Sequence, residues 1–155
     1  PEIRDVYLLS SPMSLPEGVA FDGRTRRFFA TGLLGGQITQ IDAATGEERV
    51  FFTSEAPLQF SGAKVDEVHR RLWVCASDIR GPKGGLHLFD VDSGALLRHF
   101  ELSSHGICND VCLDADGVAE LVRRTCTLAR RFADGLAAAP LVERCRRRYT
   151  YSPYR

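Results

Sequence analysis

The chain has 155 residues, of which 44% are hydrophobic and 26% are charged, values typical of one globular domain. No run approaches 18 apolar residues, so no transmembrane helix is predicted, and no basic segment followed by an apolar stretch marks a secretory signal. The net charge of zero combines two unlike parts: residues 1–118 carry 11 basic and 17 acidic side chains, whereas residues 119–155 carry 9 arginines and 3 acids. We therefore expect two parts of different character. The first residue is proline rather than methionine, which predicts a processed chain or a piece of a longer one.

The first part begins with four short runs of β-type residues in residues 17–53. Asp-Gly and Thr-Gly pairs separate these runs, and such pairs are typical of hairpin turns. We expect a hairpin at residues 22–27. The expected strands are residues 18–22, 27–32, 36–42 and 48–53.

A second and a third unit repeat this pattern. The equivalent first strands close on Asp22, Asp66 and Asp114, which lie 44 and then 48 residues apart. An inserted glycine-rich stretch at residues 81–85 accounts for the larger spacing. The expected strands of the second unit are residues 62–66, 71–76, 85–90 and 96–102. Four antiparallel strands every 45 residues or so are typical of a β-propeller blade, so we predict an all-β chain with about two and a half blades of a partial β-propeller.

The repeat stops after residue 118, inside the third unit. We therefore divide the chain into a partial propeller at residues 1–118, with repeats starting near 17, 61 and 109, and an atypical Arg-rich tail at residues 119–155. We expect the tail to be irregular or helical. It is either a basic amphipathic helix or the product of out-of-frame translation, and the second reading is favoured. The triple arginine near its end is only a weak nucleic-acid signal, so we expect neither nucleic acid nor a membrane as a partner.

Five cysteines are present, and no pair of them has the C-x-x-C spacing of a zinc ribbon or a redox motif. We expect Cys75 and Cys112 to be small buried hydrophobic residues. The odd number of cysteines favours a reducing, cytoplasmic setting.

Three ordered motifs carry a resemblance to a known family. They are Pro16-Glu17-Gly18-Val19-Ala20-Phe21-Asp22; Gly62-Ala63-Lys64-Val65-Asp66 with Arg71-Leu72-Trp73-Val74; and Asn109-Asp110-Val111 with Asp114-Ala115-Asp116-Gly117. Over residues 12–118 the chain resembles the regucalcin (senescence marker protein) and gluconolactonase family. The resemblance implies a six-bladed propeller of about twice this length, with a divalent metal, calcium or zinc, on its axis. It also implies hydrolysis of sugar lactones or similar esters.

The resemblance carries two site residues onto this chain. Glu17 matches a metal ligand of the family, and Asn109 matches a residue of the metal and substrate pocket. The family's remaining asparagine and aspartate ligands belong to blades that have no counterpart here, and no catalytic residue is identified.

Repeat geometry supports a shared pocket independently of the resemblance. Glu17, Ser61 and Asn109 occupy one repeat-equivalent position, and such positions converge near the axis of a propeller. Their oxygen atoms suit a hard cation such as calcium. His105, in the loop before Asn109, is a further pocket candidate. The alternative is that Glu17 is a solvated turn residue and that Asn109 is a turn former.

The sequence therefore favours a metal-dependent lactone or ester hydrolase of the gluconolactonase type, with a small lactone or ester as substrate. Because only two ligands are matched, we expect this chain to be a truncated form that is inactive in isolation. The alternative is a non-catalytic propeller-type binding or interaction module.

Overall fold

A computed structural model describes residues 7–11, 15–81, 84–101, 107–113, 119–123, 130–132 and 139–140. These residues form an all-β structure of three four-stranded antiparallel sheets, which confirms the predicted fold class. Within the described ranges there is no helix with the length and apolarity needed to cross a membrane.

The first sheet, or first blade, has the strand order β1-β2-β3-β4. Its strands are β1 (Pro16–Asp22), β2 (Arg27–Gly32), β3 (Gln37–Asp42) and β4 (Glu48–Thr53). Each strand starts and ends within two residues of the predicted limits. The predicted hairpin closes with Arg26 at φ 55°, and the third turn uses Gly46 at φ 74°, a conformation that glycine adopts without steric cost.

The second blade repeats this arrangement in the order β5-β6-β7-β8. Its strands are β5 (Leu58–Asp66), β6 (Arg71–Asp78), β7 (Gly84–Asp90) and β8 (Leu96–Glu101). The hairpin between β5 and β6 has Arg70 at φ 55°, the value found at the equivalent Arg26. Residues 44 positions apart thus have the same backbone angle in the equivalent turn.

The third sheet extends beyond residue 118, where the repeat signal ends. Its strands are β9 (Cys108–Leu113), β10 (Ala119–Arg123), β11 (Arg130–Phe132) and β12 (Ala139–Pro140), in the order β12-β11-β10-β9. The described segments of the Arg-rich tail are thus strands and not the helix that was one expectation, because β10 pairs with β9 as an antiparallel strand. The rest of the tail lies outside the described residues.

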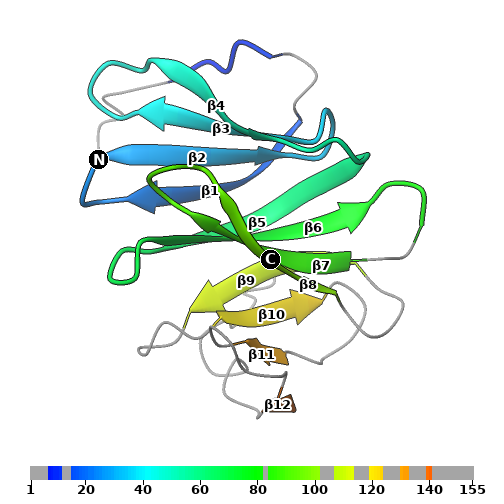
Figure 1. Ribbon diagram of the computed structural model, residues 1–155. Helices are drawn as coiled ribbons and strands as arrows, with labels where there is room; N and C mark the ends of the chain where they lie inside the picture. Colours follow the sequence, from blue (N-terminus) through cyan, green and yellow to red (C-terminus); the bar gives the residue numbers. More distant parts are fainter. Residues whose placement is uncertain are drawn as a thin grey trace, which may run out of the picture.

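The three sheets stack like consecutive propeller blades, with the first at the top of Figure 1 and the third at the bottom. Two apolar clusters fill the spaces between them and exclude water. Buried members of the first are Phe29 and Ile38 from the first blade and Phe60, Leu72 and Phe89 from the second. Buried members of the second include Trp73 and Leu86 from the second blade and Val111 from β9.

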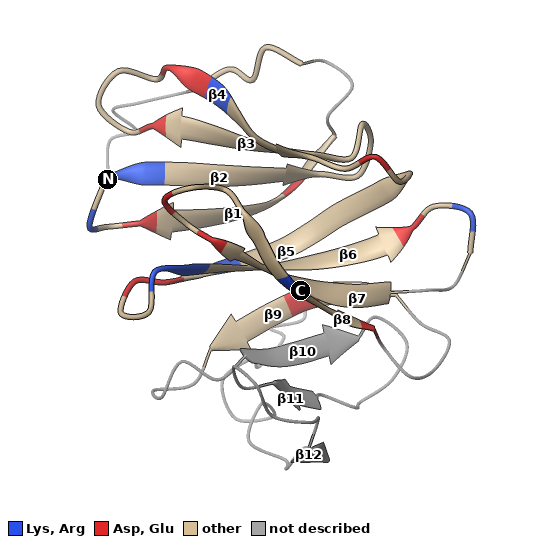
Figure 2. Cartoon of the chain, in the orientation of Figure 1, with Lys and Arg blue, Asp and Glu red and all other residues tan. Residues whose placement is uncertain are grey.

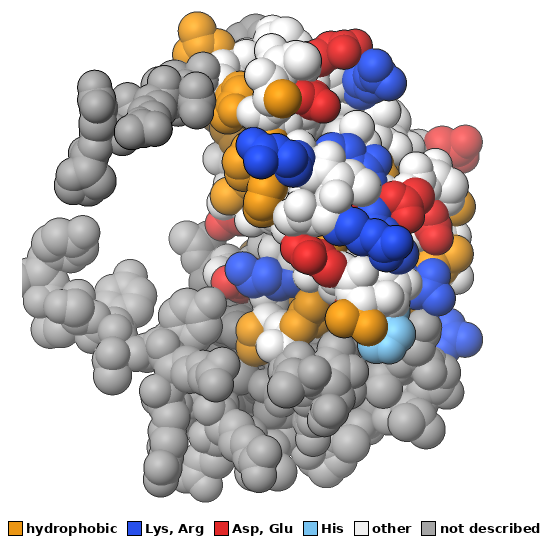
Figure 3. Space-filling view, turned by 90° about the vertical axis from the view of Figure 1, so that its left-hand side faces the viewer, with side chains coloured by type: hydrophobic (Ala, Val, Ile, Leu, Met, Phe, Trp, Pro, Cys, Tyr) orange, Lys and Arg blue, Asp and Glu red, His pale blue; other side chains and the backbone are white. Residues whose placement is uncertain are grey.

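Charged side chains gather at the strand ends and hairpins, whereas the strand interiors carry few (Figure 2). The carboxylate of Asp22 is fully buried at one such end. It accepts hydrogen bonds from Nη1 and Nη2 of Arg70 at 3.0 and 2.9 Å and from Nη2 of Arg27 at 3.2 Å. Both arginines also donate to Asp92, in the turn after β7. Figure 3 views the molecule from the left-hand side of Figure 1. On this face, acidic and basic side chains alternate across the surface.

This charged network joins the first hairpin of each blade across the interblade boundary. Burial opposes ionisation of Asp22, but hydrogen bonds from Arg70 and Thr25 outweigh it and hold the pKa of this carboxyl well below its usual 3.8. The aspartate is therefore charged at all ordinary pH values and balances the two guanidinium groups. Its contribution to stability is present above pH 4 and is lost as the pH falls toward the lowered pKa.

We predict that Asp22→Asn lowers the free energy of unfolding by about 3 kcal/mol at pH 7, because it leaves two half-buried arginines short of a buried partner. Urea unfolding measures this loss. The variant should also lose less stability than the parent protein between pH 5 and pH 2.

Glu47→Gln is the matched control. Glu47 pairs with Arg49 at 3.1 Å on the surface, and an exposed pair contributes at most about 1 kcal/mol. Equal effects of the two substitutions would contradict the role assigned to Asp22.

Candidate functional site

The innermost strands of the three sheets, β1, β5 and β9, lie side by side, because β1 packs on β5 and β5 packs on β9. Each strand has an irregularity at the same repeat position. The pairing register shifts around Glu17 in β1, around Ser61 and Gly62 in β5, and around Asn109 in β9. A β-bulge breaks the alternation of side chains and turns one of them in a new direction. Thus the three residues predicted to share a pocket all lie at bulges.

Two glycines permit the inner strands to approach closely. A Cβ atom on Gly18 would lie 2.5 Å from the carbonyl oxygen of Ser61, and one on Gly62 would lie 2.5 Å from Cα of Asp110. Real side chains do not tolerate such distances, so the backbones occupy space that any other residue would fill. The third strand carries Asp110 at the position equivalent to these glycines.

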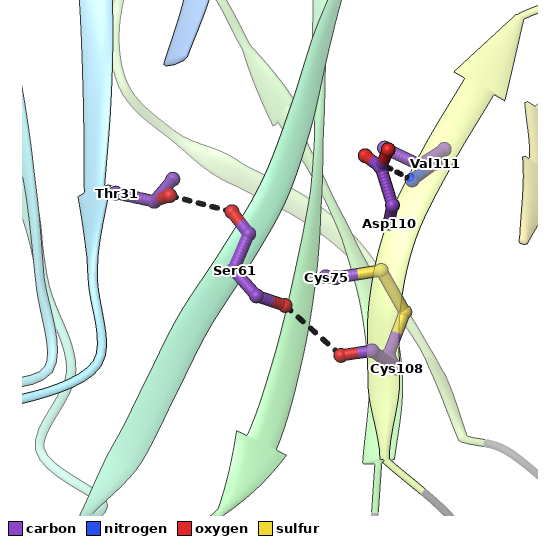
Figure 4. The surroundings of a disulfide bond; sticks show 6 residues. All are labelled: Thr31, Ser61, Cys75, Cys108, Asp110 and Val111. Carbon is purple, nitrogen blue, oxygen red and sulfur yellow. Dashed lines mark hydrogen bonds between the residues drawn. A yellow bond between two sulfur atoms is a disulfide. The ribbon is translucent and has the colours of Figure 1, made fainter. Parts of the chain in front are cut away.

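Hydroxyl groups connect the close-packed backbones. Thr31 on β2 accepts a hydrogen bond from the amide of Gly18 at 3.0 Å and donates to the carbonyl of Ser61 on the next blade. Ser61 in turn donates to the carbonyl of Cys108 at 2.9 Å. Figure 4 shows this path from the first blade to the third sheet. These hydroxyls donate to carbonyl groups at the close contacts between strands, where a carbonyl without a partner would be costly to bury.

A disulfide bond between Cys75 and Cys108 joins β6 to β9 beside this path, with 5.2 Å between the Cα atoms. Cys75 is fully buried in the second apolar cluster, as expected, but it is bonded to Cys108 and is not merely a small hydrophobic residue. Cys75 is the repeat equivalent of Thr31, so one position links each blade to the next, by a hydrogen bond first and by a disulfide second. Cys112 is half-buried on β9, so the expectation that it is a buried residue is not met.

The predicted pocket residues have different surroundings. Glu17 is exposed at the start of β1, and Asn109 is half-buried on β9. Ser61 is buried, and its hydroxyl proton is used in the bond to Cys108. His105 lies outside the described residues.

The described residues do not form a complete metal site. Among them, no three His, Cys, Asp or Glu side chains converge on one point. Glu17 and Asn109 supply oxygen donors of the right kind for calcium, but calcium takes six to eight of them. Glu17 and Asn109 alone would fill a minor part of such a coordination shell.

Sequence reasoning missed two residues of this region, Thr31 and Asp110. Thr31 is the buried hydroxyl that bridges two blades, and Asp110 accepts a hydrogen bond from the amide of Val111 at 2.8 Å beside Gly62. The repeat itself held a signal for Thr31, because its equivalent at an offset of 44 residues is Cys75, another residue able to form a directed link.

No family model and no curated protein matches the sequence, whereas solved β-propeller structures match the fold. Virginiamycin B lyase from Staphylococcus aureus aligns with a TM-score of 0.68 and 17% identity, over 87% of this chain and 43% of that one. Hydrazine synthase from Kuenenia stuttgartiensis gives 0.64 and 14%, over 87% and 37%. The gluconolactonase XC5397 from Xanthomonas campestris gives 0.54 and 23%, over 73% and 36%.

These similarities establish the propeller fold. The chain spans less than half the length of each of these proteins. A gluconolactonase is among them, but at this identity membership of the regucalcin and gluconolactonase family stays a prediction.

We predict that Gly62→Ala destabilises the protein by about 3 kcal/mol, because the added methyl group forces β5 away from β9. Thermal unfolding measures the change. Gly81→Ala is the matched control, since a Cβ atom on Gly81 meets no heavy atom of the described residues within 4 Å. A Gly62→Ala protein as stable as this control would show that the strands can separate freely.

We also predict that replacing both Cys75 and Cys108 by alanine costs about 3–4 kcal/mol, because the disulfide closes a loop with a sequence separation of 33. Urea unfolding with and without dithiothreitol provides the test. The reductant should destabilise the parent protein and leave the double variant unchanged. A parent protein indifferent to the reductant would contradict the assignment.

Proposed function

We propose that this chain carries part of the metal and substrate wall of a propeller hydrolase that acts on sugar lactones or related esters. The observation that carries the proposal is the bulge at one repeat-equivalent position of β1, β5 and β9. Bulges occur beside active sites, where they redirect side chains. The structural similarity to a gluconolactonase supports the same reaction class.

Two side chains have the chemistry that this role requires. The carboxylate of Glu17 is exposed and able to bind a divalent cation, and the amide of Asn109 offers both an acceptor oxygen and donor hydrogens to a sugar hydroxyl or a carbonyl. A bound cation in such a site polarises the carbonyl group and lowers the pKa of its water ligand. Ser61 contributes by fixing the spacing between β5 and β9.

Two donors do not make a working site. Because most ligand positions would be filled by water, the cation would be weakly held and poorly aligned with a carbonyl. The proposal therefore assigns a binding surface to the isolated chain and no catalytic turnover.

A non-catalytic interaction module is the second candidate. Val19 and Phe21 on β1 are 63% and 46% exposed, so the face of the first blade that points away from the second carries apolar side chains. Exposed apolar groups of this kind are found at interaction surfaces. Dependence on a cation separates the two candidates.

We predict that the chain, with calcium or zinc added, does not hydrolyse gluconolactone above the background rate in a pH-stat assay. Hydrolysis that disappears with a chelator and in Glu17→Gln would overturn this prediction, and would show that this chain suffices for catalysis.

Calcium titration followed by amide NMR tests the proposed wall itself. The amides of Glu17 and Asn109 should shift together, and Glu17→Gln should abolish both shifts. Glu55→Gln, a substitution in the exposed loop between the blades, should leave them intact. Absence of any shift at Glu17 and Asn109 would reject the hydrolase wall and favour the interaction module.

A further inference from the structure

Two histidines face each other on the outer strands of the second blade. His87 on β7 is directly opposite His99 on β8 in the strand register. Their ring centroids are 4.5 Å apart, and the rings are tilted by 54°. A Cβ atom on Gly85 would lie 2.5 Å from Cε1 of His99, so the ring of His99 lies over the backbone of this glycine. The absence of a side chain at Gly85 thus allows the two imidazoles to meet.

His87 has an unusual environment for a polar side chain. It is 6% exposed, and its ring lies 6.0 Å from the rings of both Phe60 and Phe89. Its Nδ1 atom is buried and has no hydrogen-bond partner in the part of the chain that the structure describes. A buried polar atom without a partner is rare in folded proteins and calls for an explanation.

His87 is in the protonation state that a metal-coordinating histidine requires. Burial, and secondarily the nearby His99, lower the pKa of His87 to about 4. The imidazole is therefore neutral near pH 7, and it retains a lone pair for a metal ion without competition from a proton.

We propose that His87 and His99 form a binding site for a divalent transition-metal ion such as nickel or zinc. Neutral imidazoles are favoured ligands of these ions, whereas calcium requires oxygen donors. Within the described residues no third His, Cys, Asp or Glu completes a cluster, so water would fill the remaining positions around a bound ion. Glu101 pairs with Gly85 and, by strand alternation, shares the face of His99. It adds a negative charge beside the site.

This site is separate from the wall assigned to the inner strands. It is built on β7 and β8, the third and fourth strands of the blade, with nitrogen donors, whereas Glu17 and Asn109 offer oxygen donors on β1 and β9. The two proposals therefore succeed or fail independently.

Titration of the whole chain with Ni²⁺ tests the proposal, because nickel prefers imidazole and zinc also binds free thiolates. Calorimetry should show saturable binding that His99→Gln weakens at least tenfold. His99 is exposed, so this variant should fold, and its circular dichroism spectrum verifies that it does. His87→Gln should weaken binding to a similar extent. In the parent protein, Ni²⁺ should broaden the ring-proton signals of His87 and His99 before those of any other histidine.

His69→Gln is the matched control. His69 lies in the β5–β6 hairpin, where its Nδ1 atom is 2.7 Å from Asp66, and its loss should leave nickel affinity unchanged. Glu17→Gln should also have no effect. Three results would each overturn the proposal: no saturable binding, equal affinity in the folded His99→Gln protein, or loss of binding in His69→Gln in place of His99→Gln.

Discussion

The contact between the backbones of neighbouring inner strands determines how the sheets of this protein stack. At Gly18 and Gly62 the strands come so close that a single methyl group would overlap the facing backbone. This proximity leaves no room for water, so each displaced carbonyl needs a partner from the protein. Thr31 and Ser61 supply these partners through their hydroxyl groups. Small residues and short hydroxyl side chains are therefore needed at the same points, and the repeat places them there.

The opposite end of the interblade boundary is held by charge. Asp22 is buried between two arginines from different hairpins, and the aromatic residues of the first apolar cluster pack between the first and second blades. Polar groups at the two ends fix the relative orientation of the blades, while the apolar cluster provides most of the driving force. At the boundary between the second blade and the third sheet, the Cys75–Cys108 disulfide takes the place that the hydrogen bond from Thr31 to Ser61 has between the first two blades.

This architecture has consequences for chemistry at the axis. Each of the three inner strands has one irregular residue, so in the proposed site the coordination shell would grow with the number of blades around the axis. Glu17 and Asn109 would be its members from this chain, whereas the hydroxyl of Ser61 is used in a structural hydrogen bond. The His87–His99 pair does not depend on the number of blades, because two adjacent strands of one blade suffice to bring its rings together. Oxygen donors from several blades and nitrogen donors from one blade would select different ions.

The sequence by itself determined the strands and hairpins of the first two blades. Turn chemistry and strand alternation are local properties, and the 44-residue repeat related Arg26 to Arg70 before their equal backbone angles were known. The same local reasoning ended at residue 118, because it had no means of recognising β10 without the pairing partner β9. Only the tertiary structure decided that Cys75 bonds to Cys108 and that the hydroxyl of Ser61 donates a hydrogen bond to a neighbouring strand. These contacts join residues far apart in the chain, and they depend on the distance between packed sheets, which no short stretch of sequence encodes.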